Sequence, residues 1–431
     1  MMLRKCMACL WALICAANVA WASAAEPSWP VFHGPHGDNH SADVGLLTTW
    51  PKDGPKRLWT AKGLGSGFAS VSIGNGRIYT AGNVGADTVV TALDLSGKQL
   101  WQVKAGKAWT PGPGGVRGTP TIDGEQLYYE NPHGDLFALE AKTGKKIWEL
   151  NLLKRFGSQN ITWGLAESVI VDGPRLICLP GGPKASVVAL DKETGKTVWQ
   201  AASAADDLAG YATALVVQQD GLRIVLTMTA KALIGVDADG GKLLFRYPHQ
   251  TAYDVNATTP IFHDGQIFIS SGYGTTGSVM LKLTVDGAKA SVKKVWGSRE
   301  LDNHHGGVIL VDGYLYGAAH NFNGGKWICL DWKTGAKQYA EHGVGKGSAT
   351  YADGCLYMLS ENRAVGLAKA TPAGLTLVGR FRTPSGPDGP TWAHPVVCGG
   401  RLYIRHAENL YVYDVKGLVR PHRIEIGRRL P

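Results

Sequence analysis

The sequence predicts an all-β protein, an eight-bladed β-propeller made of four-stranded antiparallel blades. The first observation is a repeat with a period of about 40–50 residues, which is typical of propeller blades. The second is a tight turn between two apolar segments at the start of each copy. The third is composition, because 57 glycines in 431 residues and only 18% charged residues favour many short strands and turns over helices.

The tight turns predict the inner hairpin of each blade. Asp-Gly and Asn-Gly between apolar segments are the strongest short signals for a hairpin, because both turn residues need positive φ. Eight such turns predict eight blades. In chain order they are Asn75-Gly76, Asp123-Gly124, Asp172-Gly173, Asp220-Gly221, Asp264-Gly265, Asp312-Gly313, Asp353-Gly354 and Gly399-Gly400.

A second turn predicts the outer hairpin of each blade. Residues 139–148 read LEAKTGKKIW and residues 190–199 read LDKETGKTVW, and looser copies end at Trp101, Phe245 and Trp296. A tryptophan at a fixed place in each repeat predicts packing between neighbouring blades, because it buries a large area and has one N–H to satisfy. We therefore assign these tryptophans to the core and not to a ligand site.

The two ends of the repeat predict how the ring closes. Residues 50–59 read as a lone outer strand, and the last repeat has no outer strand of its own. We expect Leu58 and Trp59 to pair with the last blade, which hides both free sheet edges. Residues 50–417 then form the propeller and residues 25–49 a loop-rich cover. The basic residues 418–431 fall outside the repeat and are expected to be disordered.

The first 24 residues resemble an export signal. Arg4 and Lys5 precede an apolar run, and Ala22-Ser23-Ala24 reads as a cleavage site. The run is short for a membrane span, and no later segment is long and apolar enough for one. We expect a monomeric protein that is periplasmic or secreted. The sequence has no nucleic-acid motif, so we do not expect it to bind nucleic acid.

The state of the four later cysteines stays open. Export permits disulfides, but strand-like surroundings equally suit buried free thiols at Cys178, Cys329, Cys355 and Cys398.

One mouth of the central channel is the candidate binding site. In a propeller, the residues just before each innermost strand gather at this mouth, and folding does not require them to be polar or aromatic. Such residues predict a site for a small molecule, peptide, protein or glycan. The alternative is that they bond to one another and to water. The set is Arg117, Trp163, Glu167, Tyr211, Asn256, Asn303, His304, His305, Lys346, Trp392 and His394, with Phe68 nearby.

Two histidine clusters are candidate metal sites. His304 and His305 are adjacent, and neighbouring residues on a strand point to opposite faces, so they do not easily share one metal unless the strand is bent. The N-terminal cluster of histidines lies in a turn-rich segment without a defined fourth zinc ligand, which favours a capping loop. It comprises His33, His36 and His40 with Asp38. The sequence therefore predicts no metal.

The repeat at residues 189–199, Ala-Leu-Asp-x-x-Thr-Gly-Lys-x-x-Trp, resembles that of exported bacterial PQQ-like propeller proteins. These belong to the quinoprotein alcohol dehydrogenase-like superfamily, and the likeness covers residues 50–417. The phrases ITWGLAES at 161–168 and NHHGG at 303–307 add to it. The dehydrogenases bind pyrroloquinoline quinone (PQQ) with calcium against a vicinal disulfide. By residue type, the resemblance nominates Glu167, Asn256 and Asp302 for calcium and Trp163 for stacking.

Two functions are open at this point. In the first, the protein is a binding or scaffold protein that acts through its funnel face. An outer-membrane assembly factor of the same superfamily provides the precedent, because it has the propeller without the cofactor. In the alternative, it is a PQQ- and calcium-dependent alcohol or sugar dehydrogenase. The sequence has no adjacent cysteines after residue 24 and no haem motif. These features favour the first function, no cofactor is assigned, and whether the protein is an enzyme stays open.

Overall fold

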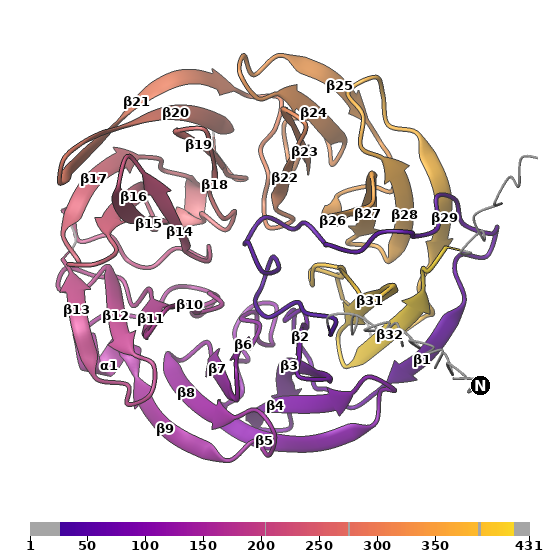
Figure 1. The fold of residues 1–431 in the computed structure, drawn as a ribbon, viewed down its shortest axis with the longest axis horizontal. Helices are drawn as coiled ribbons and strands as arrows, with labels where there is room; N and C mark the ends of the chain where they lie inside the picture. Colours follow the sequence, from indigo (N-terminus) through magenta and orange to yellow (C-terminus); the bar gives the residue numbers. More distant parts are fainter. Residues whose placement is uncertain (1–25, 203, 275, 387–388, 418–431) are drawn as a thin grey trace, which may run out of the picture.

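The computed structural model describes residues 26–417, except 203, 275, 387 and 388. Eight four-stranded antiparallel sheets surround a central axis (Figure 1). The predicted fold class and number of blades are confirmed. The expected signal peptide, residues 1–24, and the basic segment, residues 418–431, lie outside the described residues.

In blades 1 to 4 the strands follow one another outward from the axis. Blade 1 contains β2 Ser72–Gly74, β3 Arg77–Val84, β4 Asp87–Asp94 and β5 Gln99–Lys107. Blade 2 contains β6 Thr121–Asp123, β7 Gln126–Glu130, β8 Asp135–Glu140 and β9 Lys146–Asn151. Blade 3 contains β10 Ile170–Asp172, β11 Arg175–Cys178, β12 Val187–Asp191 and β13 Thr197–Ala201. Blade 4 contains β14 Leu215–Gln219, β15 Leu222–Met228, β16 Ala232–Asp237 and β17 Leu243–Pro248.

Blades 5 to 7 repeat this order, and blade 8 takes its outer strand from the start of the propeller. Blade 5 contains β18 Ile261–His263, β19 Gln266–Ser270, β20 Ser278–Asp286 and β21 Lys289–Ser298. Blade 6 contains β22 Val308–Val311, β23 Tyr314–Ala318, β24 Trp327–Asp331 and β25 Lys337–Glu341. Blade 7 contains β26 Gly347–Ala352, β27 Cys355–Ser360, β28 Ala364–Lys369 and β29 Leu377–Arg382. Blade 8 contains β30 Val396–Cys398, β31 Arg401–His406, β32 Asn409–Asp414 and β1 Arg57–Ala61.

The ring closes as expected. β1 pairs antiparallel with β32, and Trp59 lies opposite Val412. The outer strand is shorter than predicted, because only Arg57–Ala61 pairs. Trp50, predicted at its start, instead packs on blade 7, where a Cβ on Gly379 would lie 2.6 Å from the Trp50 Cβ. The first and last strands of the propeller thus belong to one sheet, in which β1 covers the edge of β32 that would otherwise be free.

Six of the eight inner turns have the predicted geometry, with positive φ at both residues. The turns of blades 2 and 3 differ by one residue. Asp123 pairs with Gln126, and Asp172 pairs with Arg175, so the loop residues are Gly124-Glu125 and Gly173-Pro174. Proline fixes φ near −65° and so fits only a turn with glycine first.

The repeated tryptophans join neighbouring blades, as predicted. Each indole lies over the glycine of the outer turn in the next blade and donates its Nε1–H to a carbonyl there. For example, Trp199 of blade 3 donates to Ala238 O of blade 4 at 3.1 Å and covers Gly241. Trp59 makes the same contact across the closing joint, with Leu95 O and Gly97 of blade 1. The other contacts are Trp101 on Gly144, Trp148 on Gly195 and Trp296 on Gly335.

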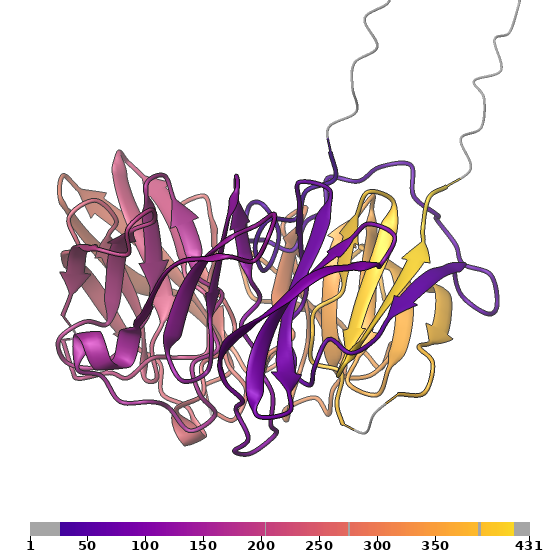
Figure 2. The same ribbon diagram turned by 90° about the horizontal axis from the view of Figure 1, so that it is seen from below.

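Residues 26–49 lie across one face of the ring, the upper face in Figure 2. Trp29 pairs with Ile73 of β2, and the Asp43 carboxylate accepts hydrogen bonds from the Gly399 and Gly400 amides. These contacts involve innermost strands and inner turns. The residues that precede the innermost strands therefore meet at the opposite mouth of the channel.

Helical structure is limited to α1, Leu152–Phe156, and a 3₁₀ turn, Ala252–Asp254. Neither is long and apolar enough to cross a membrane, and no other helix occurs among the described residues. The four described cysteines are buried free thiols and form no disulfide, which decides between the two possibilities left by the sequence. They are Cys178, Cys329, Cys355 and Cys398.

Candidate ligand-binding site in the funnel

The mouth opposite the cover contains a cavity of about 380 Å³. Most of its wall is aromatic, and residues from blades 1 to 6 and 8 contribute to it together with Phe32 of the cover. The structure brings together seven predicted residues here, and Phe68 with them. They are Arg117, Trp163, Tyr211, His304, His305, Trp392 and His394.

Glu167, Asn256 and Asn303 are not brought to the cavity. Their neighbours Ala166, Ser168, Val255 and Ala257 line it, whereas these three side chains are buried behind the wall. Side chains alternate along extended chain, so an error of one residue in counting moves a side chain to the other face. Each of the three is bonded to backbone: Glu167 accepts from Leu179 N, while Asn256 and Asn303 donate to carbonyls such as Thr229 O and Ala318 O.

Glu361 organises one side of the site and was missed by the sequence reasoning. Its Oε1 lies 2.8 Å from Lys346 Nζ, 3.0 Å from His305 Nε2 and 2.8 Å from Trp392 Nε1. Burial alone would raise the pKa of Glu361, but the hydrogen bonds from His305 and Lys346 outweigh it and lower the pKa to about 2. Lys346, which was predicted, therefore acts here as the counter-ion of a permanent carboxylate.

Glu361 escaped notice because it lies in the turn between β27 and β28, not before an innermost strand. Tyr273, in the β19–β20 connection, and Phe32, in the cover, were missed for the same reason. Glu361 is one of many half-buried carboxylates in the described part of the chain, so only its spatial neighbours identify it. No signal in the sequence alone singles out these three residues.

The histidines of the cavity are neutral at neutral pH. Burial lowers the pKa of His394 to about 4, and it lowers the pKa of His305 and, further still, that of His304. The chain is bent before β22, so the His304 and His305 rings lie side by side, with centroids 4.5 Å apart, instead of pointing oppositely. With Glu361 they place three potential metal ligands within 4.8 Å of one another.

Lys346 occupies the place that a metal would take in this cluster. Its ammonium lies 3.2 Å from His304 Nδ1 and 2.8 Å from Glu361 Oε1. A divalent cation would have to displace this charge and then face it at short range. The arrangement therefore favours an internal salt bridge, and the interpretation without a metal is retained.

Arg117 carries the charge that the cavity leaves uncompensated. Its guanidinium donates to Gly115 O at 3.1 Å and Pro113 O at 2.9 Å, and it lies 5.4 Å from the centre of the Phe68 ring. Burial lowers the pKa of Arg117 to about 10, and no carboxylate among the described residues forms an ion pair with it. With Lys346 neutralised by Glu361 and the imidazoles neutral, the cavity suits an anionic group carried next to a flat apolar one.

The residues nominated for calcium do not form a site. Asp302 accepts from the amides of His320 and Asn321, at 2.8 and 2.7 Å, and Asn256 donates to three carbonyls. Glu167 faces Glu130, another carboxyl group, inside the protein. The three groups have their partners at different places in the ring, so these residues do not fit a shared calcium ion.

The cover closes the channel behind the cavity. The His33 ring stacks on His394 with centroids 5.0 Å apart, and Phe32 lies 4.8 Å from the same ring. His40 Nε2 lies 3.0 Å from Leu310 O, and Asp38 accepts a hydrogen bond from the His40 amide. These contacts are those of a capping loop, the interpretation that the sequence favoured.

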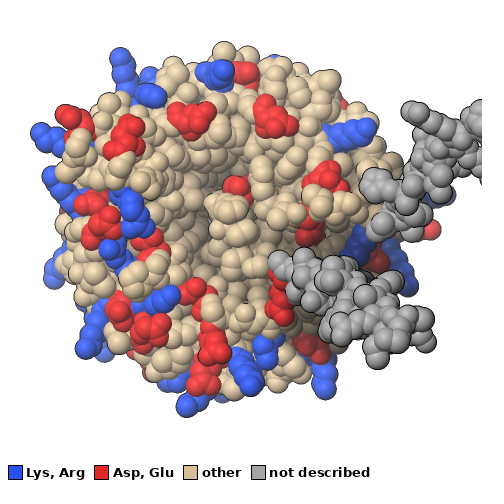
Figure 3. All heavy atoms as spheres, in the orientation of Figure 1, with Lys and Arg blue, Asp and Glu red and all other residues tan. Residues whose placement is uncertain are grey.

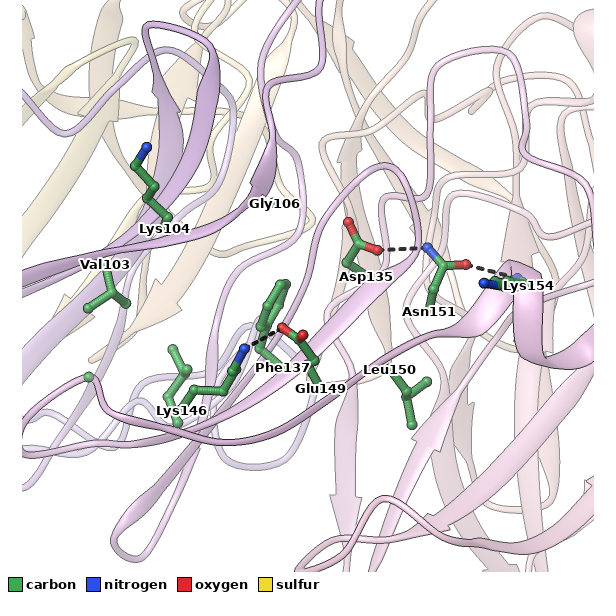
Figure 4. A pocket seen from close by; sticks show the side chains of 12 residues that line it. Val103, Lys104, Gly106, Asp135, Phe137, Lys146, Glu149, Leu150, Asn151 and Lys154 are labelled. Carbon is green, nitrogen blue, oxygen red and sulfur yellow. Dashed lines mark hydrogen bonds and ion pairs between the residues drawn. The ribbon is translucent and has the colours of Figure 1, made fainter.

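A larger hollow, of about 650 Å³, lies on the outer side of blades 1 and 2 (Figure 4). Its side chains are Lys146 paired with Glu149, Asp135 bonded to Asn151, and solvent-exposed lysines such as Lys104. Opposite charges there already neutralise one another, and no aromatic wall encloses a ligand. We therefore treat it as a matched control surface for the funnel.

Two carboxyl groups behind the cavity give a testable pH dependence. Burial raises the pKa of Glu130, and the nearby Glu167 raises it further; burial also raises the pKa of Glu167 to about 7. Because the folded-state pKa lies above the ordinary value of 4.5, this contribution to stability is complete below pH 4.5 and is lost as the pH rises to about 7. Between pH 4.5 and 8 we expect the free energy of unfolding of Glu167→Gln to fall by less than that of the wild type, by on the order of 3 kcal/mol.

The measurement is the free energy of unfolding by urea between pH 4.5 and 8. Glu125→Gln, at an exposed carboxylate in the same blade as Glu130, is the control and should retain the wild-type pH dependence. An unchanged slope in Glu167→Gln would show that the pair is not protonated in the folded protein.

Sequence comparison identifies the family. A profile described as "Outer membrane protein assembly factor BamB" (PQQ_2) matches residues 17–169 and 86–341. BamB from Yersinia pestis is 24% identical over 265 residues, which are 60% of this chain and 64% of that protein. The chain thus spans less than two thirds of the length of this relative.

Structural comparison supports the same fold. BamB from Moraxella catarrhalis superposes with a TM-score of 0.59 at 16% identity, over 85% of this chain and 99% of that one. Quinohemoprotein alcohol dehydrogenase from Comamonas testosteroni gives 0.63 at 14% identity, over 91% and 81%. At such low identity the likeness shows the fold alone. Because the profile covers most of the propeller, the chain belongs to the PQQ-like family described as outer membrane protein assembly factor BamB.

Proposed function

We propose that the protein is a binding or scaffold protein in outer-membrane protein assembly, which docks a partner protein through the funnel mouth. The observation that carries the proposal is the aromatic cavity with one uncompensated guanidinium, Arg117. A partner segment with a carboxylate beside a flat apolar side chain would complement it. Membership of the BamB family agrees with the expected location, periplasmic or secreted.

A genetic complementation experiment tests this function. Deletion of the gene in the source bacterium should reduce the amount of folded outer-membrane protein, and the wild-type gene should restore it. We expect Arg117→Gln and Trp163→Ala, which alter the cavity wall, to restore less than half of that amount. Lys104→Gln in the outer hollow of Figure 4 should restore it fully.

All variants must show wild-type thermal unfolding, so that a loss of function is not a loss of folding. Full restoration by both funnel variants would contradict docking through this mouth. An unaltered outer membrane in the deletion strain would contradict the role in assembly.

The dehydrogenase alternative is tested on the purified protein. PQQ and Ca²⁺ are added, and absorption and dye reduction are recorded with alcohols and aldoses. We expect no turnover, because the nominated calcium ligands have their partners at different places in the ring. Bound quinone with turnover would replace the scaffold proposal by an enzymatic one.

A further inference from the structure

The cover shows how an extended chain can bind to the inner edges of the blades. Trp29 and Ile73 exchange two backbone hydrogen bonds of 2.8 Å, and Ile122 N donates to Pro30 O at 2.8 Å. On the other side of the axis, Tyr351 N donates to Asn39 O at 2.9 Å. The innermost strands β2, β6 and β26 are therefore all paired with residues of the cover.

The inner edges of blades 4 and 5 face a groove instead. It has a volume of about 640 Å³ and lies between residues 36–40 of the cover and strands β14, β18 and β22. Figure 3 shows this face, with a hollow beside the central segment and few charged atoms on its walls. Apolar residues that line the groove, Ile261 and Phe262, are half-buried, whereas Ile73 and Ile122 under the cover are 0% and 5% exposed.

The charge of the groove is negative. Asp38 and Asp312 line it, and no lysine or arginine does so among the described residues. Asp220 and Asp264 stand exposed at the neighbouring inner turns of blades 4 and 5. Acidic side chains also surround the hollow in Figure 3. Basic side chains would therefore strengthen the binding of a segment that fills the groove.

We infer that this groove binds a basic, extended segment of a partner protein. Its backbone pairs with the free edges of β14 and β18, as the cover pairs with β2, β6 and β26. Its apolar side chains cover Ile261 and Phe262, and its basic side chains lie near Asp312 and Asp264. This surface is on the face opposite the funnel, so it provides a second docking site that is independent of the function proposed for the cavity.

Fluorescence anisotropy with a labelled peptide tests the site on the purified full-length protein. The probe is an eight-residue peptide of alternating lysine and valine. We expect saturable binding that weakens with salt. A glutamate–valine peptide should bind at least tenfold more weakly, and so should a lysine–valine peptide N-methylated on alternate residues, because it lacks backbone donors. Hydrogen exchange should slow in β14 and β18 on binding.

Variants locate the site. The double substitution Asp264→Asn with Asp312→Asn alters two exposed turn residues and should weaken binding about tenfold at low salt. Asp286→Asn, at an exposed turn on the outer edge of blade 5, and Trp163→Ala in the funnel should bind the peptide normally. The funnel variant thus separates this site from the proposed function.

Three results would overturn binding at this groove, and a fourth would overturn the assignment of its occupant. The first three are equal affinity for the N-methylated peptide, full affinity in the double variant, and protection of strands other than β14 and β18. If a chain that ends at Gly417 binds the peptide at least tenfold more tightly than the full chain, the natural occupant is the chain's own basic end and not a partner.

Discussion

Trp199→Ala should lower the free energy of unfolding by about 3–5 kcal/mol, the usual cost of removing a buried tryptophan. The indole is 8% exposed, spans the joint between blades 3 and 4 and donates its N–H to Ala238 O at 3.1 Å. Its loss leaves a cavity and removes one of the two side-chain hydrogen bonds that Ala238 O accepts, the other coming from Arg175, at a joint on which the closed ring depends. Chemical denaturation monitored by far-ultraviolet circular dichroism measures the effect.

The partner glycine offers a matched pair of variants. Gly241 and Gly221 both belong to blade 4 and both have positive φ, +73° and +82°. A Cβ on Gly241 would lie 2.7 Å from Trp199 Cε3, whereas one on Gly221 meets nothing within 4 Å. We expect Gly221→Ala to cost about 1–2 kcal/mol for its backbone strain alone. Gly241→Ala should cost roughly 2 kcal/mol more, because the indole must move.

Trp199→Phe separates packing from the hydrogen bond. It should recover most of the loss and leave a deficit of about 1 kcal/mol for the missing donor. If Trp199→Ala costs no more than an exposed substitution, or if the two glycine variants are equal, the indole does not hold the blades together.

Acid should destabilise the protein through its buried imidazoles, and His249→Gln should reduce this effect. Burial lowers the pKa of His249 from 6.5 to about 4, and neither ring nitrogen has a hydrogen-bond partner within the described part of the chain. Because the folded-state pKa is depressed, the contribution is present above pH 6.5 and is lost as the pH falls toward 4. A shift of this size corresponds to a difference on the order of 3 kcal/mol.

The free energy of unfolding between pH 7 and 4 provides the measurement. We expect the wild type to lose stability steeply, since burial also lowers the pKa of His394 to about 4. The decrease in the free energy of unfolding with falling pH should be smaller in His249→Gln, by the contribution of one imidazole. His342→Gln, at an exposed histidine, is the control and should follow the wild type. Parallel curves for wild type and His249→Gln would refute the assignment.

Local sequence signals were sufficient for the architecture because a propeller repeats one local unit. Glycine at a turn and tryptophan at the end of a repeat are fixed by backbone conformation and by contact with the next blade. The inner turn recurs in all eight copies and the tryptophan in five, so each prediction was supported by several instances. The exceptions were local too: Pro174 changed the turn of blade 3, and Trp50 packed on blade 7 instead of continuing β1.

The candidate site depended on information that no single repeat contains. Counting from the turns located the funnel mouth, but the alternation of side chains decided that Ser168 and not Glu167 faces the cavity. The charge of the cavity followed from Glu361, which neutralises Lys346 and leaves Arg117 alone. Those residues come from blades 2, 7 and the segment before blade 7, and only closure of the ring makes them neighbours.

The sequence by itself determined the number of blades, the joints between them and the strand that closes the ring, because short-range backbone and packing rules act within one repeat and its neighbour. Only the tertiary structure decided which rim side chains share a cavity, that Phe32 and His33 close it from behind, and that the inner edges of blades 4 and 5 stay open. Burial and charge at these places arise from contacts between distant repeats, and no local pattern encodes them.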